Sequence, residues 1–401
     1  MFNKVIGQSN VINLLKHDIN NVTLNNSILF YGAKFSGKLK TALELTRILN
    51  CLKDKEDNCS CSNCVRINNL DFEGLIFLSR RNFLYLLKEY ISSYLKSNNI
   101  KYLLDIKKNI KLFTLPLQDF LINNTFSEQD KKDLSSYLER ISTIFENNIP
   151  DSNDLEKMVD VISLINGKYK SENIPVDTIR SMLDWTYINQ PDINRVIIID
   201  HVDHLEKSSQ NILLKRLEEP SRNLFFILIA ENKNRIAQTI LSRCRLYYFN
   251  NLKIDSVKEI INQTFGAESY HNSIYNFLTR NEETSRENIL PVINKLLNLV
   301  FQKEAPFSDL SLFLNTLKDR KYVKALLVEL TAFLEKDISG SENVLNSKID
   351  FKIFENHSEI SIDSLKTLLL KKANLIEDFG LNSILLLEGI FYPLKAMAAN
   401  D

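Results

Sequence analysis

Apolar residues in the first 50 positions switch between helical spacing and short continuous runs. Residues 10–20 carry apolar side chains at helical spacing, whereas residues 27–31 form an apolar run that leads into Gly32. A second helical stretch, residues 41–49, follows Lys38. The order of strand, glycine-bearing loop and helix predicts the front of a parallel α/β unit.

Three further apolar runs predict buried strands, at residues 75–78, 195–200 and 223–230. Residues from about 81 to 165 are rich in Leu, Ile and Tyr at helical spacing and contain no motif that we can assign. We interpret them as a mostly helical insertion. From about residue 252 the pattern is helical to the end of the chain. The prediction is an α/β domain with a parallel sheet and flanking helices, followed by all-α segments.

A chain of 401 residues is too long for one compact core, so we expect two or three domains. Only 9 glycines and 8 prolines favour a helix-rich protein. The formal net charge of zero provides no overall attraction to nucleic acid, so any DNA contact needs a local patch or a partner. No apolar stretch reaches the roughly 20 residues that cross a bilayer, and no secretory leader is evident, so we expect a cytoplasmic location.

Four of the five cysteines lie close together, at Cys51, Cys59, Cys61 and Cys64. In a reducing compartment such clustering favours metal binding over disulfides. Four thiolates would hold a structural Zn²⁺ and staple a short segment that lacks its own core. The alternative is a set of reduced free thiols. A catalytic zinc is not expected, because four protein ligands leave no open position.

Gly32, Gly37 and Lys38 match most of the pattern G-x-x-x-x-G-K-[ST] of phosphate-binding loops. The last position fails, because Leu39 occupies the place of the hydroxyl that binds magnesium. Thr41, two residues on, projects from another side of the helix. Two interpretations stay open: a relic loop that only makes the turn, or residual nucleotide binding with weak magnesium coordination.

Asp200 ends its apolar run as a magnesium-binding aspartate does in P-loop proteins. His201 follows where a general-base glutamate is expected, so hydrolysis lacks its base. A histidine can accept a proton, but it has a shorter reach than the expected glutamate, so we expect no catalytic task for His201. Asp203 is a candidate helix cap.

Arg243 lies in the segment Leu241-Ser242-Arg243-Cys244, after the last strand signal. An arginine at such a subunit edge can stabilise the phosphoryl group of a neighbour's nucleotide, although an isolated loop arginine is usually a surface cation.

Together these pieces resemble the bacterial clamp-loader family of AAA+ proteins, and within it the delta-prime type of DNA polymerase III subunit. The most specific matching stretches are residues 211–220 and 239–244. The weaker matches are residues 5–8, 32–38 and 174–180, and the cysteine cluster. The helical insertion is foreign to the usual family layout.

The resemblance implies an AAA+ domain over residues 1–250, a helical lid over 251–300 and a helical collar over 301–401. It implies a pentameric ring with gamma/tau and delta subunits that loads a sliding clamp onto primed DNA. Arg243 would be the arginine finger that serves a neighbour's ATP. Arg286 would be the lid arginine that senses nucleotide, and Glu231-Asn232 occupies the place of the first sensor.

We therefore expect a subunit without ATPase activity, in which Gly32, Gly37, Lys38, Asp200 and Arg286 form a degenerate site with weak or absent ATP/Mg²⁺ binding. One alternative is a gamma/tau-type motor subunit with unusual site residues. A second is a zinc-stapled, DNA-binding scaffold unrelated to clamps.

Overall fold

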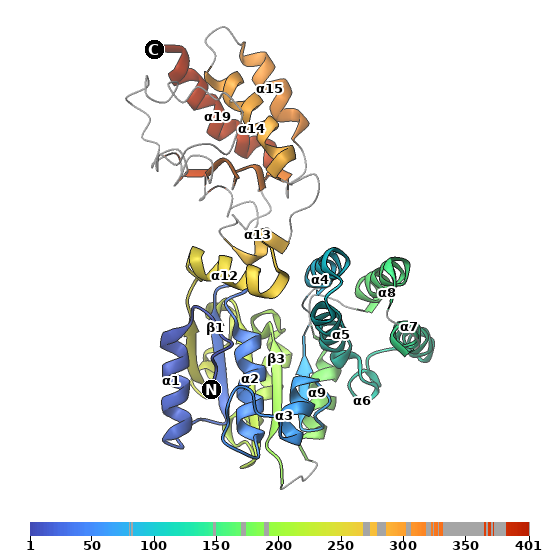
Figure 1. Cartoon of the computed structure of the whole chain (residues 1–401). Coiled ribbons are helices and arrows are strands. Elements are labelled where there is room, and N and C mark those ends of the chain that lie inside the picture. The colour runs from blue at the N-terminus through green and yellow to red at the C-terminus, as the bar shows by residue number, and fades with distance from the viewer. Residues whose placement is uncertain are drawn as a thin grey trace. The chain divides into compact units, whose positions relative to one another are not determined.

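The computed structural model places five parallel strands at the centre of the N-terminal part of the chain (Figure 1). These are β1 (Ser27–Gly32), β2 (Leu75–Leu78), β3 (Arg195–Asp200), β4 (Leu224–Ala230) and β5 (Arg245–Phe249). Their order across the sheet is β2-β3-β4-β1-β5. The predicted parallel α/β fold is confirmed, whereas β5 was not predicted.

The chain divides into two units, residues 1–278 and 279–401, which we describe separately. The structure describes residues 1–79, 81, 83–146, 150–169, 174–187, 192–267, 273–278, 286–301, 306–317, 322–323, 325–327, 329–331, 365, 368–369, 372 and 382–400. Within these residues, no helix is both long and apolar enough to span a bilayer.

Helices cover both faces of the sheet, because alternate strand residues point to opposite sides. On one face, Phe30 and its neighbours pack against α1 (Ser9–Asn20) and α2 (Lys38–Asn50). On the other face, Leu29 packs in a core with α9 (Val176–Trp185) and α10 (Lys207–Glu218). Every residue of β3 is buried, as expected for a central parallel strand covered on both faces.

The carboxyl ends of β1, β3 and β4 meet at one edge of the sheet, because all strands run in the same direction. This edge brings together Gly32, Asp200 and Glu231 from distant parts of the sequence. Open parallel sheets commonly bind ligands at this edge.

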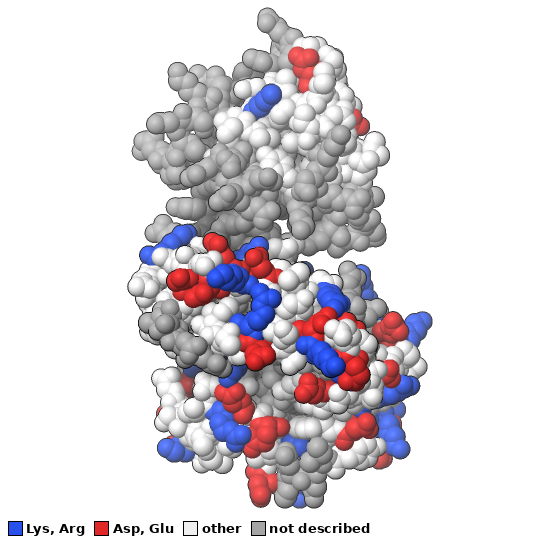
Figure 2. All heavy atoms as spheres, turned by 90° about the vertical axis from the view of Figure 1, so that its right-hand side faces the viewer, with Lys and Arg blue, Asp and Glu red and all other residues white. Residues whose placement is uncertain are grey.

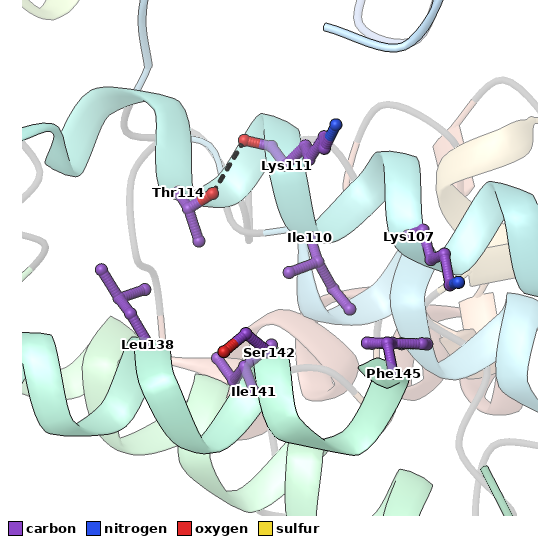
Figure 3. Close-up of a pocket in the computed structure, with 8 residues that line it drawn as sticks. All are labelled: Lys107, Ile110, Lys111, Thr114, Leu138, Ile141, Ser142 and Phe145. Atoms are coloured by element: carbon purple, nitrogen blue, oxygen red, sulfur yellow. Dashed lines mark hydrogen bonds between the residues drawn. The ribbon is translucent and has the colours of Figure 1, made fainter. Parts of the chain in front are cut away.

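Between β2 and α9, the described residues form five α-helices, which we call the α4–α8 segment. They are α4 (Leu84–Ser97), α5 (Ile100–Thr114), α6 (Asp119–Ile122), α7 (Glu128–Glu146) and α8 (Ser152–Tyr169). The helical prediction for this part of the sequence is confirmed. Apolar side chains of these helices extend the core of the α1–α2 face. A groove of about 380 Å³ separates α5 from α7 and is lined by Ile110, Ile141 and Phe145 (Figure 3).

Two short helices close the first unit: α12 (Ile254–Phe265) and α13 (Ile274–Leu278). In the second unit, α14 (Arg286–Phe301), α15 (Phe307–Thr316) and α19 (Ser383–Asn400) share an apolar core. The predicted lid, residues 251–300, is thus divided between the two units. The three-domain organisation stays a prediction.

Charges of both signs are interspersed on the face of the first unit that Figure 2 shows. Among the described residues visible there, no continuous stripe of Lys and Arg appears. This pattern agrees with the zero net charge of the whole sequence.

Replacing Gly32 with Ala should lower the free energy of unfolding by about 2–3 kcal/mol, since strained backbone positions belong among the costly substitutions. Gly32 has φ +129°, and an added Cβ would lie 2.1 Å from the carbonyl oxygen of Phe249. Gly167→Ala is the control, because this exposed helical position has open space around it. It should raise stability by up to about 1 kcal/mol. Equal urea midpoints for the two variants would contradict the interpretation of Gly32.

Candidate nucleotide site and metal centre

Lys38 is folded back onto the loop that carries it. Its Nζ donates hydrogen bonds to the carbonyl oxygen of Gly32 at 2.7 Å and to that of Ala33, and lies 3.5 Å from Ser36 Oγ. The side chain is 4% exposed, and its burial lowers the pKa of Lys38 to about 8. The three N–H groups of this lysine therefore have partners within the chain.

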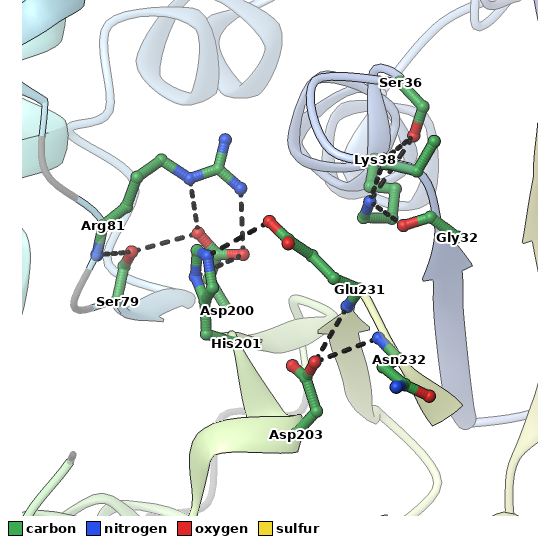
Figure 4. A network of polar contacts seen from close by, with 11 residues as sticks. Gly32, Ser36, Lys38, Ser79, Arg81, Asp200, His201, Asp203, Glu231 and Asn232 are labelled. Atoms are coloured by element: carbon green, nitrogen blue, oxygen red, sulfur yellow. Dashed lines mark hydrogen bonds and ion pairs between the residues drawn. The ribbon is translucent and has the colours of Figure 1, made fainter. Parts of the chain in front are cut away.

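Asp200 is held by two residues that the sequence analysis missed, Ser79 and Arg81 (Figure 4). Arg81 donates from Nε to Oδ2 at 3.0 Å and from Nη2 to Oδ1 at 3.1 Å. Ser79 Oγ donates to Oδ2 at 3.0 Å. Both residues follow β2, the direct neighbour of β3 in the sheet, so the strand order alone brings them to Asp200. The strand order has no local signal in the sequence.

The Asp200 carboxylate is 1% exposed, and burial by itself raises its pKa. The charges of Arg81 and His201, with the hydrogen bonds of Arg81, outweigh burial and hold the pKa of Asp200 well below its usual range. The carboxylate is therefore ionised at neutral pH and paired. Breaking such a buried pair by removing one partner typically costs about 3–5 kcal/mol.

His201 links two carboxylates across the sheet edge. Its Nδ1 lies 3.3 Å from Asp200 Oδ1, and its Nε2 lies 3.7 Å from Glu231 Oε1. Burial alone lowers the pKa of His201, but Asp200 and Glu231 outweigh it and raise the pKa to about 9. The protonated imidazolium is a structural cation here, and it has no free nitrogen to accept a proton from water.

Asp203 has a role other than that of a helix cap. Its Oδ2 accepts hydrogen bonds from the backbone N–H groups of Glu231 at 3.2 Å and Asn232 at 3.0 Å. Asp203 lies in a short 3-10 turn after β3, so it ties this turn to the end of β4.

The residues present do not fit a magnesium–nucleotide complex. Both oxygens of Asp200 are occupied by Arg81, and Leu39 offers no oxygen ligand for Mg²⁺, a cation that is bound by oxygen atoms. The cavity beside Lys38 has a volume of about 200 Å³. Ligand pockets commonly measure about 300–1,000 Å³. Weak or absent ATP/Mg²⁺ binding remains our prediction for this site.

Arg243 lies in the turn between α11 (Gln238–Leu241) and β5. Its Nη1 donates to the carbonyl oxygen of Thr239 at 2.9 Å, and its Nη2 donates to Glu218 Oε2 at 3.0 Å. Arg243 is not among the residues that line the Lys38 cavity. The role of Arg243 as an arginine finger stays a prediction.

Arg286 begins α14, but its side chain lies outside the described residues. Its predicted role as a nucleotide sensor stays a prediction. Glu231 and Asn232 follow β4 at the sheet edge, as predicted, and Glu231 pairs with His201.

The four clustered cysteines come together at the end of α2. The sulfur atoms of Cys51, Cys59, Cys61 and Cys64 all lie within 4.8 Å of one another. Cys51 follows α2, Cys61 is the N-cap residue of α3 (Ser62–Asn68), and Cys64 lies in the first turn of that helix. Four sulfur ligands bound to zinc at about 2.3 Å fit a separation of this size. The donor set therefore fits a tetrahedral Zn²⁺.

Arg47 supplies positive charge next to this cluster. Its side chain is fully buried, and its Nη1 lies 3.4 Å from Cys64 Sγ. Glu44 accepts from Nη2 of Arg47 at 2.6 Å and from Nε at 3.0 Å, which fixes the guanidinium. Burial alone raises the pKa of Cys61, but backbone hydrogen bonds from Cys64 and Leu52 lower it to about 6. Burial and the neighbouring thiols raise the pKa of Cys64 to about 12, so the surroundings favour the thiolate, the form that binds metal, at Cys61 but not at Cys64.

Comparison with known proteins gives a family match. The family model described as "DNA polymerase III, delta subunit" matches residues 7–253. A DNA polymerase III subunit gamma of Buchnera aphidicola subsp. Baizongia pistaciae is 22% identical over 302 residues, which are 74% of this chain and 58% of that protein. A DNA polymerase III subunit delta' of Haemophilus influenzae is 34% identical over 87 residues, which are 21% of this chain and 25% of that protein.

The chain thus covers less than two thirds of the length of these relatives. Among solved structures, a DNA polymerase III gamma subunit-related protein of Thermotoga maritima is 17% identical, with 57% of this chain and 81% of that chain covered. Its TM-score is 0.27, so this likeness carries no argument.

His201→Gln should change how stability depends on pH. Because the folded-state pKa of about 9 lies above the ordinary value of 6.5, the contribution of His201 is fully present below about pH 6.5 and is lost as the pH rises through 9. At pH 7 the variant should unfold more easily by roughly 2 kcal/mol, a difference that should disappear above about pH 10.

Chemical denaturation at pH 6, 7, 8, 9 and 10 measures this difference. Lys38 has the opposite effect, because its lowered pKa of about 8 makes the free energy of unfolding rise with pH. This effect is the same in the wild type and in His201→Gln, so it cancels in the difference between them. His17→Gln is the control, because the His17 side chain is 69% exposed. A constant difference between wild type and His201→Gln at every pH would contradict the ion-pair role.

Proposed function

The chain belongs to the DNA polymerase III delta-subunit family, which matches it over residues 7–253, and from this membership we propose that it is a delta-prime-like, non-hydrolysing clamp-loader subunit. In this proposal it occupies a pentameric ring with gamma/tau and delta subunits. The ring loads the sliding clamp onto primed DNA, and the cytoplasm is the expected location. DNA contacts are made mainly through the complex, in agreement with the net charge of zero.

The observation that carries the proposal is the Arg81–Asp200 pair at the sheet edge. Phosphoryl transfer in P-loop proteins requires a metal ion that neutralises the phosphate charge and a group that orients the attacking water. Here the aspartate is paired with an arginine, and the neighbouring position is a histidine bound between two carboxylates. Leu39 removes the hydroxyl ligand as well. The site therefore lacks three components of hydrolysis: a carboxylate that is free to bind the metal ion, a group that orients the attacking water, and the hydroxyl ligand of the metal ion.

Arg243 supports the second half of the proposal, the arginine finger offered to a neighbouring subunit. Its present partner, Glu218, is 58% exposed, and exposed ion pairs typically contribute about 0.2–1 kcal/mol. An arginine finger contributes a factor of about 10³–10⁵ to the rate of hydrolysis. Releasing Arg243 from Glu218 is therefore a small cost beside that gain.

A gamma/tau-type motor is the second candidate, because the relative from Buchnera that is matched over 74% of this chain is a gamma subunit. Steady-state ATP turnover separates the two functions. Competent enzymes commonly turn over at about 1 per second or faster, so turnover above about 0.1 per second by this chain alone would favour the motor. The third candidate, a DNA-binding scaffold, has less support, because the charges on the face in Figure 2 are mixed. Strong DNA binding by the isolated chain would revive it.

The cysteine cluster completes the proposal as a structural zinc site. Bound zinc would hold the end of α2, the following loop and α3 together through Cys51, Cys59, Cys61 and Cys64. Four cysteine ligands leave no open coordination position on the zinc ion, so the ion would have no catalytic task.

Arg243→Ala should leave the chain folded and lower ATP hydrolysis by the reconstituted complex about 10³-fold at the site that Arg243 faces. Arg243→Lys tests whether the forked guanidinium is needed, since lysine keeps the charge but not the fork. Arg222→Ala, at another exposed arginine of the first unit, is the control. Unchanged hydrolysis in the Arg243→Ala complex would reject the finger assignment.

Metal analysis should find about one zinc ion per chain, and Cys64→Ser should release it, because each ligand of a structural site is needed for stable binding. The matched control is Cys244→Ser, since Cys244 is buried but lies outside the cluster. Elemental analysis after gel filtration gives the result. A zinc content that both substitutions leave equal would contradict the site.

A further inference from the structure

The α4–α8 segment reaches the phosphate loop from one side. Arg81, just before α4, and Leu86, within α4, line the cavity beside Lys38. The opposite wall includes Ile260 and Phe265 from α12. The cavity is therefore lined by the loop, by the beginning of the helical segment and by α12.

Arg81 occupies the position in which a P-loop protein needs a divalent cation. Its Nε and Nη2 each bind a different oxygen of Asp200, at 3.0 and 3.1 Å. Such bidentate, charge-assisted pairs are both strong and specific in geometry. A metal ion would need the same oxygen atoms, so Arg81 and Mg²⁺ exclude each other.

The same segment also binds α12. Ser93 Oγ, on α4, donates a buried hydrogen bond of 3.0 Å to the carbonyl oxygen of Phe265. Lys101 Nζ, on α5, donates to the carbonyl oxygen of Gln263 at 2.6 Å. These carbonyls belong to the last turn of α12, where helix carbonyls lack partners within the helix.

Apolar contacts strengthen this attachment. Helices α12 and α13 form a small core of their own, against which Phe35 of the phosphate loop and Tyr85, Leu86 and Tyr90 of α4 pack. The rings of Tyr90 and Phe265 lie 5.1 Å apart. Without α4, this small core would be open on one side.

We propose that Arg81 and the α4–α8 segment form an internal lock, which holds the phosphate-loop site closed and fixes α12 and α13 against it. The guanidinium takes the place of magnesium, and α4 takes over the task of holding α12 and α13, which a bound nucleotide would otherwise share. This role does not depend on membership of a clamp loader. The lock gives the α4–α8 segment a function, which its sequence alone did not indicate.

The cation half of the lock is the claim that Arg81 excludes Mg²⁺ from Asp200. Restoring the missing hydroxyl at position 39, with and without Arg81, tests it. The proteins are Leu39→Thr and the double variant Leu39→Thr, Arg81→Met, each titrated with fluorescently labelled ADP with and without Mg²⁺. Leu39→Thr alone should show no effect of Mg²⁺ on affinity, because Arg81 still holds Asp200. In the double variant, Mg²⁺ should tighten ADP binding at least about 10-fold.

Two outcomes would overturn the cation half. One is a magnesium effect of equal size in Leu39→Thr alone; the other is a double variant that gains no magnesium-dependent binding. Thermal unfolding must show that each variant is folded. If Arg81→Met does not fold, Arg81→Gln replaces it, since glutamine removes the charge but can still donate a hydrogen bond to Asp200. It should also allow a magnesium effect, and no effect at all would count against the lock.

Hydrogen exchange on the full chain tests the attachment of α12. Tyr90→Ala should speed exchange of the amides in the last turn of α12 at least about 10-fold, because a local opening becomes easier. Lys88→Ala, an exposed position on the same helix, is the control and should leave these amides unchanged. Equal exchange in the two variants would show that α4 does not hold α12.

Discussion

One ion pair decides what the carboxyl edge of the sheet can do. Asp200 is a buried carboxylate, and a buried charge is tolerated only when it is paired. Evolution of a P-loop fold offers two ways to meet that requirement, a metal ion that comes with the nucleotide or a cation built into the chain. This chain uses the second way, through Arg81. Lys38, His201 and Glu231 then find partners within the protein as well.

A site whose polar groups all have partners within the protein favours a stable fold over a cycle of nucleotide binding, hydrolysis and release. An enzyme that hydrolyses ATP must bind, react and release, so its polar groups have to exchange partners at each step. Here the exchange would leave charged groups buried without partners, which is expensive. The same arrangement agrees with a subunit whose contribution to hydrolysis is made through Arg243, on a different part of its surface.

The sequence predicted much of the architecture because its signals are local. The strands β1, β2, β3 and β4 are apolar runs, and the helical segment shows clear periodicity. The cysteine cluster was found because its members lie within a short stretch of sequence. Strand β5 was not predicted because it lies at the edge of the sheet with three of its five residues exposed, so it is not a run of buried side chains. The role of Arg81 depends on which strands are neighbours, and that order has no local signal.

Helix α2 carries a second consequence. The phosphate loop lies at one end of this buried helix, and Arg47 and Cys51 lie at the other, about 20 Å away for a helix of this length. Both ends are anchored by charged contacts, so α2 behaves as a rigid rod between two distant chemical environments. If metal binding at the cysteines holds α2 in place, the effect is reciprocal, and a more firmly held phosphate loop would in turn raise the affinity for metal.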